Sequence, residues 1–277
     1  MNTQNNSSKV ALVTGASSGI GKAIALQLIE DGLTVYVAAR RVEKMQDLKQ
    51  LGAISLKMDV TVEEDIKRVV EQIEHNHKGV DVLVNNAGCA LYGAMEDTVI
   101  EDARRQFEVN LFGVANLTKA ILPAMKAKKH GKIINISSIG GKTYTPLGSW
   151  YHATKHALEG WSDCLRLELA LFNIDVVIIE PGVIKTDFGS VTLAPMLQRS
   201  ASSVYLPIAK KIEQMVKSYQ KPGNASDPAV IAKVVSQAIE ARKPKTRYVA
   251  GKYAKLLIIL RKLLNDRLFD KIIMSSY

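Results

Sequence analysis

From Val10 to about Glu180, the chain alternates short runs of β-branched residues with longer segments whose apolar residues recur at helical spacing. Apolar strands that alternate with helices predict a parallel sheet, covered by helices on both faces and connected by right-handed crossovers. The expected strands are Val10–Thr14, Thr34–Ala39, Ile54–Met58, Val80–Val84, Lys132–Ser137, Asp175–Glu180 and Arg247–Ala250. The expected helices are Gly19–Asp31, Val42–Leu51, Val62–His77, Ile100–Lys128, Trp150–Phe172 and Pro228–Ala241. The pattern therefore predicts an α/β fold with a doubly wound parallel sheet of about seven strands.

No composition break, low-complexity linker or repeat divides the 277 residues, so we expect one domain over residues 1–277. Two segments depart from the alternation. The segment at about 183–227 is rich in Ser and Thr, and long loops at the carboxyl ends of parallel strands commonly form lids or binding walls. It ends at Asp227, which we expect to cap the helix that follows. The segment at about 252–277 is basic and aliphatic, and it predicts one or two amphipathic helices.

Composition limits the class of protein. With 47% hydrophobic and 23% charged residues, the chain is neither disordered nor collagen-like. No run of about 18 apolar residues is present to span a bilayer, and Met1–Lys9 is polar where a signal peptide would be apolar. The two cysteines, Cys89 and Cys164, are too few for a disulfide framework. We expect a cytoplasmic protein with at most a peripheral membrane contact.

The charge balance of 37 basic against 27 acidic residues, a net +10, suggests an anionic partner. Aromatic residues are not interleaved with the basic clusters, however, so we expect no nucleic-acid partner. The histidines lack metal-ligand spacing, so no metal is expected, and His152 is interpreted as a helix-surface residue. One basic cluster is interpreted as the solvated face of surface helices: Lys126, Lys128, Lys129 and Lys132.

A glycine-rich turn joins the first expected strand to the first expected helix. It consists of Thr14-Gly15-Ala16-Ser17-Ser18-Gly19-Ile20-Gly21. Glycines permit a tight turn and let backbone N–H groups approach a pyrophosphate at the helix N-terminus. Three glycines alone are a weak signal, but their place between a strand and a helix is the context that predicts a dinucleotide site.

This spacing, Gly-x-x-x-Gly-x-Gly, resembles the short-chain dehydrogenase/reductase family when it is taken with the motifs that follow it. The resemblance covers about Val10 to Asp187, and it implies a single-domain Rossmann fold. It also implies an oxidoreductase that transfers hydride between a nicotinamide and a carbonyl or secondary alcohol. The matching motifs, in order, are Asp59-Val60, Asn85-Asn86-Ala87-Gly88, Asn110, Ser138, Tyr151-His152-Ala153-Thr154-Lys155 and Pro181-Gly182.

The end of the second expected strand bears on the choice of cofactor. Members of the family that use NAD usually place an acidic residue there, whereas this chain has Ala38-Ala39-Arg40-Arg41. A carboxylate would repel a 2′-phosphate, and a guanidinium can pair with one, so NADP(H) is the expected cofactor. Further cofactor contacts implied by the resemblance are Gly15, Ser17, Ser18, Gly19, Ile20, Gly21, Asp59, Val60, Asn86, Ala87, Gly88, Tyr151, Lys155, Pro181, Gly182 and Thr186.

Tyr151 and Lys155 are four residues apart at the start of an expected helix and therefore share one face. A free tyrosine has a pKa near 10, and an ammonium about 4 Å away stabilises the phenolate by about 4 kcal/mol at an effective dielectric near 20. We therefore expect Lys155, aided by the positive nicotinamide when NADP⁺ is bound, to lower the tyrosine pKa by about two to three units.

The resemblance implies the catalytic roles. Tyr151 transfers the proton, and Ser138 polarises the substrate oxygen, with Ser137 as the weaker candidate. Lys155 lowers the tyrosine pKa and binds the nicotinamide ribose. Asn110 kinks its helix and holds a water for proton relay.

The substrate class is less constrained. Arg40-Arg41, with Met45 and Leu48, resembles the branch of steroid, retinol and acyl-dihydroxyacetone-phosphate reductases, which implies a small apolar carbonyl or alcohol substrate. Residues that either line an apolar cavity or only pack the lid are Met196, Leu197, Tyr205, Leu206, Ile208 and Met215.

Three further points stay open at this stage. The main alternative to an oxidoreductase is a catalytically silent NADP-binding regulator. A sugar-nucleotide epimerase is a further alternative, but it would need different glycine spacing and a longer chain. The family implies a homo-oligomer. The tail either packs over the substrate cleft or lies on an anionic membrane.

Overall fold

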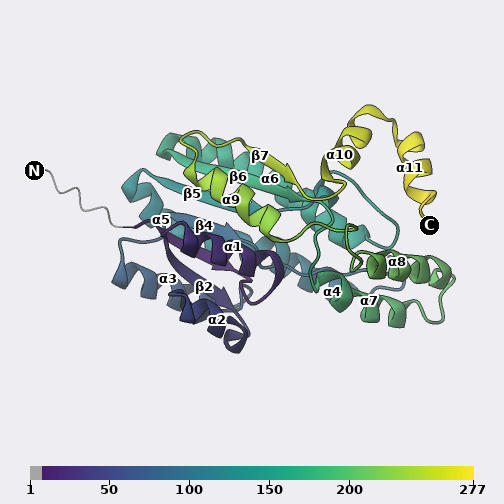
Figure 1. The fold of residues 1–277 in the computed structure, drawn as a ribbon, viewed down its shortest axis with the longest axis horizontal. Coiled ribbons are helices and arrows are strands. Elements are labelled where there is room, and N and C mark those ends of the chain that lie inside the picture. Colours follow the sequence, from purple (N-terminus) through teal and green to yellow (C-terminus); the bar gives the residue numbers. More distant parts are fainter. Residues whose placement is uncertain (1–7) are drawn as a thin grey trace, which may run out of the picture.

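A parallel β-sheet forms the centre of the molecule (Figure 1). The computed structural model describes residues 8–277, apart from the side chains of Phe188 and Ser190, so most of the polar segment Met1–Lys9 lies outside the described residues. The strands are β1 (Val10–Thr14), β2 (Thr34–Ala39), β3 (Ile54–Lys57), β4 (Val82–Asn85), β5 (Gly131–Ile136), β6 (Ile174–Pro181) and β7 (Arg247–Ala250). Their order is β3-β2-β1-β4-β5-β6-β7, and all neighbours pair in parallel. The predicted doubly wound α/β fold is confirmed, with its switch point between β1 and β4.

Helices cover both faces of this sheet. The first face carries α1 (Gly19–Glu30), α2 (Gln46–Gln50), which follows a 3₁₀ turn at Val42–Met45, and α9 (Ala229–Glu240). The second carries α3 (Glu63–Asn76), α5 (Gly113–Lys128) and α6 (Ser149–Leu169), which a 3₁₀ turn at Ala170–Phe172 extends. Strand residues alternate between the faces: Val13 packs in the first layer and Leu12 in the second.

The helix expected over Ile100–Lys128 is interrupted. It consists of α4 (Ile100–Phe107), a π-turn at Glu108–Phe112, and α5. Single π-turns inside helices break the regular hydrogen-bond ladder and often mark functional positions. Asn110 lies in this turn, so the expected kink takes the form of a π-turn.

The segment between β6 and α9 contains α7 (Phe188–Arg199) and α8 (Leu206–Ser218), and the tail contains α10 (Ala254–Leu263) and α11 (Asp266–Met274). In Figure 1 all four lie at the end of the molecule toward which the strands run. The carboxylate of Asp227 accepts the backbone N–H of Ala229 at 2.8 Å and so caps the start of α9.

Lys132 is not on a solvated face, so that interpretation of the basic cluster is wrong for this residue. Its side chain is buried, and its Nζ lies 3.1, 2.6 and 2.6 Å from the carbonyl oxygens of Ala238, Ile239 and Ala241. The last carbonyls of a helix have no partner within the helix and carry the negative end of its dipole. A lysine on β5 therefore caps the C-terminus of α9 and ties this helix to the sheet.

Replacing Lys132 by Met should lower the free energy of unfolding by about 2–3 kcal/mol, because buried carbonyls lose a charged donor. Urea denaturation followed by circular dichroism measures this change. Lys119→Met, at an exposed position on α5, is the matched control. Equal stability of the two variants would show that the cap does not stabilise the fold.

Candidate active site

The glycine-rich turn brings the ends of three strands together. The Gly15 N–H donates to the Ala38 carbonyl at the end of β2, 2.8 Å away, and Gly15 has a φ of +65°. A Cβ atom at Gly21 would lie 2.3 Å from the Asn86 amide nitrogen, in the loop after β4. Only glycine can occupy this position without moving that loop. The turn is therefore packed against the loop that follows the neighbouring strand.

The start of α1 has the features of an anion site. Ser18 is the N-cap residue, yet its side chain accepts no capping hydrogen bond, and the first turn contains no acidic residue. Backbone N–H groups at a helix N-terminus favour a negative charge when no side chain caps them. Gly19 has a φ of +57°, and its Cβ position lies 3.3 Å from the Thr186 methyl group. The turn therefore fits a pyrophosphate, with Thr186 at its border.

Arg40 stands where β2 ends. Its side chain is 64% exposed, and Nη1 lies 3.9 Å from a carboxylate oxygen of Asp59, which follows β3. The other carboxylate oxygen of Asp59 accepts the backbone N–H and the hydroxyl of Thr61. Arg41 is exposed beside it, and Val60 is buried. The guanidinium can therefore reach an anionic group at this edge of the sheet.

Asn86 joins the loops after β1 and β4. Its amide nitrogen donates to the carbonyls of Thr14 (2.9 Å) and Gly15 (3.3 Å). In return, the Thr14 hydroxyl accepts the backbone N–H groups of Asn86 and Ala87. These bonds hold the segment that continues to Gly88 beside the glycine-rich turn.

The structure brings Ser138, Tyr151 and Lys155 together. Ser138 follows β5, and its side chain hydrogen-bonds the Tyr151 side chain from the first turn of α6. The Lys155 Nζ donates to the Ile136 carbonyl at 2.9 Å, one turn further along the same helix. Ser137, by contrast, points its hydroxyl into the protein interior, where it has no hydrogen-bond partner among the described residues. The geometry thus favours Ser138 over Ser137 at the reacting end.

The expected lowering of the tyrosine pKa, which includes the charge of a bound NADP⁺, stays a prediction for the complex, because burial has the opposite effect in the protein alone. Burial raises the pKa of Tyr151, and the hydrogen bond from Ser138 opposes that rise only in part. Burial also lowers the pKa of Lys155, to about 8. Both shifts have one cause, because removal from water disfavours the charged form of each group. The phenol is therefore protonated at neutral pH and suited to donate a proton.

Asn110 holds three segments together from the π-turn. Its side-chain oxygen accepts the Cys89 N–H at 2.9 Å, and its side-chain nitrogen donates to the Cys89 carbonyl and the Thr154 hydroxyl. Both ends of the amide are thus engaged. These bonds fix the orientation of the amide, and the role of Asn110 in holding a relay water stays a prediction.

His152 is buried, so its interpretation as a helix-surface residue is wrong. The Thr145 N–H donates to Nε2 at 3.1 Å, which requires this nitrogen to be unprotonated. Nδ1 then carries the proton and donates to the Gly140 carbonyl at 2.9 Å. Gly140 and Gly148 leave room for the ring, since a Cβ at Gly148 would lie 2.7 Å from it. His152 therefore fastens the Ser138 loop to the start of α6.

Because burial lowers the pKa of His152 below its ordinary value of about 6.5, the unfolded chain binds more protons near that pH. The contribution of neutral His152 to stability is present above about pH 6.5 and is lost as the pH falls below it. The free energy of unfolding of the wild type should fall between about pH 7 and about pH 5. In His152→Asn this fall should be smaller, by up to about 1.4 kcal/mol per pH unit. Urea denaturation across this range tests it, with the exposed His75→Asn as control. Parallel pH profiles for wild type and His152→Asn would contradict this assignment.

Comparisons with known proteins identify the family. The family model described as short chain dehydrogenase matches residues 9–196. The chain belongs to the short-chain dehydrogenase family. The dehydrogenase is 40% identical over 266 residues to the uncharacterized oxidoreductase YusZ of Bacillus subtilis, with 92% of this chain and 93% of that protein covered. It is 34% identical to an NADPH-dependent 3-dehydrocapnine reductase of Ornithobacterium rhinotracheale, with 95% of both chains covered. A 3-ketodihydrosphingosine reductase of Bacteroides thetaiotaomicron is 42% identical over 65% of each chain.

Solved structures agree with this assignment. A short-chain dehydrogenase from Streptomyces avermitilis superimposes with a TM-score of 0.78 at 34% identity, covering 97% of this chain and 96% of that one. A serine dehydrogenase solved with NADP⁺ has a TM-score of 0.77 at 27% identity, covering 87% and 94%.

An apolar wall lies beside Tyr151. The ring of Tyr92 lies 5.7 Å from that of Tyr151, and Tyr92 packs against an apolar cluster between α7 and α8. Arg199, at the end of α7, pairs with Asp102 at 2.8 Å and donates to the Tyr92 carbonyl, which anchors these helices. Leu206 and Met215 lie on α8 but outside this cluster. Of the residues proposed from the sequence, the cluster contains Met196, Leu197, Tyr205 and Ile208.

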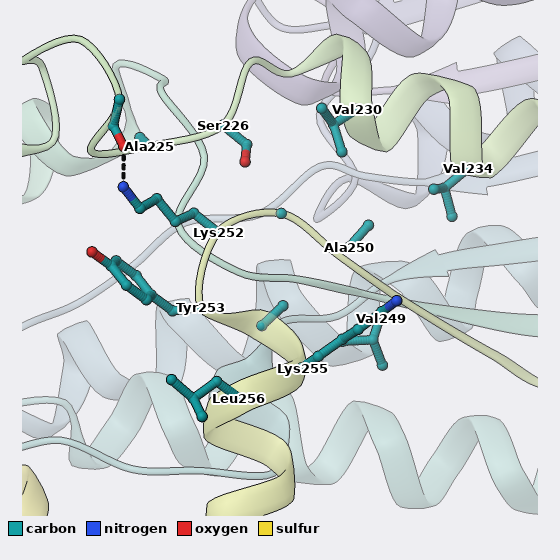
Figure 2. Close-up of a pocket in the computed structure, with 13 residues that line it drawn as sticks. Ala225, Ser226, Val230, Val234, Val249, Ala250, Lys252, Tyr253, Lys255 and Leu256 are labelled. Carbon is teal, nitrogen blue, oxygen red and sulfur yellow. Dashed lines mark hydrogen bonds between the residues drawn. The ribbon is translucent and has the colours of Figure 1, made fainter.

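A separate open depression lies between the start of α9, β7 and the start of α10 (Figure 2). Val230, Val234 and Val249 line it, together with Lys252, whose Nζ donates to the Gly223 carbonyl. None of the residues expected to bind cofactor or to act in catalysis lines this depression. It is therefore distinct from the candidate active site.

Two searches of residues 8–277 complete the description. No group of three or more His, Cys, Asp or Glu side chains there is arranged to hold a metal ion. Among the helices of the same residues, none has the length and apolar character to cross a membrane.

Proposed function

We propose that the dehydrogenase is an NADP(H)-dependent oxidoreductase that interconverts a carbonyl and a secondary alcohol on an apolar substrate. The observation that carries this proposal is the buried Ser138–Tyr151 hydrogen bond beside Lys155. It supplies a proton donor and a polarising hydroxyl at one point, as carbonyl reduction requires. A catalytically silent NADP-binding role would have no need of such a constellation.

The dinucleotide would bind along the carboxyl edge of the sheet. Backbone N–H groups from Gly15 to Gly21 would bind the pyrophosphate, and Arg40, helped by Arg41, would pair with the 2′-phosphate. Asp59 and Val60 would contact the adenine. At the other end, the nicotinamide would lie near Asn86, Ala87, Gly88, Pro181, Gly182 and Thr186.

In the reductive direction, the bound cofactor supplies the hydride. The Ser138 hydroxyl donates a hydrogen bond to the substrate carbonyl oxygen and stabilises the negative charge that develops there. Tyr151, which burial keeps protonated, donates its proton to the same oxygen. The Lys155 ammonium stabilises the resulting phenolate and binds the ribose hydroxyls.

The apolar substrate is supported by the wall next to Tyr151. Tyr92 is partly exposed there and packs against the buried side chains of Leu147 and Met196, and burying apolar surface against such a wall stabilises a ligand by about 25 cal/mol per Å². Two of the relatives are named as reductases of 3-keto or 3-dehydro compounds. Assaying a series of ketones of increasing chain length, with NADPH consumption as the readout, tests this substrate class. Turnover that does not rise with chain length would contradict it.

The proposal includes a homo-oligomer in the cytoplasm. Free thiols at Cys89 and Cys164 suit a reducing compartment. Large apolar side chains are exposed on the π-turn and α6, as at Phe112 and Leu167, and this suits a contact between subunits.

Tyr151→Phe should lose at least about 100-fold in turnover, because it removes the proton while keeping the ring. NADPH binding should remain within about twofold of wild type, since the phenol contributes little to affinity in this proposal. Steady-state kinetics and fluorescence titration of NADPH separate the two effects. Tyr253→Phe, at an exposed phenol, is the control. Near-normal turnover of Tyr151→Phe would place the chemistry elsewhere.

NADPH should bind at least about tenfold more tightly than NADH, a difference of about 1.4 kcal/mol that a single charged contact can supply. Arg40→Ala should remove most of this preference by weakening NADPH binding alone. Calorimetric titration of both cofactors into wild type, Arg40→Ala and the exposed control Arg242→Ala measures it. A wild type with equal affinities for the two cofactors would overturn the assignment of Arg40.

A further inference from the structure

The two tail helices turn apolar residues toward solvent. The side chains of five aliphatic residues on this face are 40–74% exposed. Their spacing of three and four residues within each helix places them on one side of it. In an ordinary surface helix this side would be polar. The residues are Leu256, Ile259 and Leu263 on α10 and Leu268 and Ile272 on α11.

The opposite side of the tail already holds it to the body of the protein. Phe269 is fully buried, and its ring lies 5.4 Å from that of Tyr144. The Tyr144 hydroxyl donates to the Asp270 carboxylate at 2.8 Å, and Ala254 is buried at the start of α10. The outward aliphatic residues therefore do not contribute to packing the tail against the rest of the protein.

The outward face is also cationic. Four basic residues are exposed, each directly before one of the outward aliphatic residues: Lys255, Lys262, Arg267 and Lys271. The two acidic residues of the tail are otherwise engaged, because Asp266 pairs with Arg261 at 2.8 Å and Asp270 with Tyr144. An aliphatic stripe bordered by basic residues suits the interface between anionic headgroups and acyl chains.

We propose that the outward face of α10 and α11 docks on an anionic lipid surface. The charge of the outward face favours a lipid surface over a second copy of the chain as its partner. Two copies that met through this face about a twofold axis would bring like-charged Lys and Arg residues together, whereas an anionic surface complements them.

The outward face adjoins a second surface at the start of α10. Lys255 and Leu256 also line the open depression, to which α9 contributes Val230 and Val234 (Figure 2). At its other end, Tyr277 packs against the apolar cluster. Docking would therefore bring the substrate wall close to the lipid. The docking itself does not depend on the proposed reaction.

Sedimentation of the full-length protein with vesicles tests the proposal without reference to turnover. The protein should bind vesicles of phosphatidylcholine and phosphatidylglycerol at low salt. Binding should fall at least about tenfold at high salt or on pure phosphatidylcholine, because several charges contribute.

Variants of the tail divide the two contributions. The triple variant Leu256→Ser, Ile259→Ser, Leu263→Ser should lose at least about tenfold in vesicle binding, since it removes the apolar stripe. The double variant Lys255→Gln, Lys262→Gln should lose mainly the salt-dependent part of vesicle binding. Leu171→Ser, at a leucine 87% exposed outside the tail, should bind like wild type. Circular dichroism and thermal unfolding establish that every variant is folded.

Two outcomes would overturn the proposal. In the first, the wild type ignores both kinds of vesicle while the triple variant dissociates an oligomer in sedimentation velocity. The face would then be an interface between copies. In the second, the triple variant binds vesicles as well as wild type does, so another surface is responsible.

Discussion

Parallel pairing of the strands is the constraint on which the candidate active site depends. Because β1 to β7 all run in one direction, every loop that follows a strand emerges at the same edge of the sheet. Residues far apart along the chain therefore meet there, since Asn86 lies against Gly15 and Thr186 lies against Gly19. The point where strand order reverses, between β1 and β4, is where such sheets place a ligand crevice, and glycines there leave room for the Asn86 side chain to join the two loops.

Burial sets the protonation states at the reacting end of this crevice. Tyr151 and Lys155 are both withdrawn from water on the first turns of α6, so burial raises the pKa of the phenol and lowers that of the amine to about 8. A neutral phenol held by Ser138 is an acid rather than a base. The resting site therefore holds a protonated phenol, and Lys155, with a pKa of about 8, still carries its charge at neutral pH. Neutral His152 supports this arrangement by holding the Ser138 loop against α6.

The segments added to the Rossmann core surround the reacting end with apolar surface. Helices α7 and α8 contribute the cluster beside Tyr92, and the tail returns to that cluster at Tyr277. The same tail exposes an aliphatic and basic face on its other side. One short segment can thus pack against the protein with its inner side and contact a lipid surface with its outer side, because its two helices carry apolar residues on both sides.

Periodicity and local motifs in the sequence determined the order of the elements, the glycine turn, and the positions of Ser138, Tyr151 and Lys155. Such signals are local, since a strand or helix face is set by residues two to four positions apart. Only the tertiary structure decided which groups meet across the chain. Lys132 looked like one of several surface lysines, yet it caps a helix 106 residues away, and no local pattern records that contact. The burial of His152 was likewise not predictable from local sequence, because its partners Gly140 and Thr145 come from a loop folded onto its helix. The direction of the tyrosine pKa was also a tertiary matter: the sequence placed an ammonium near the phenol, but the burial that outweighs it arises only when the chain is folded.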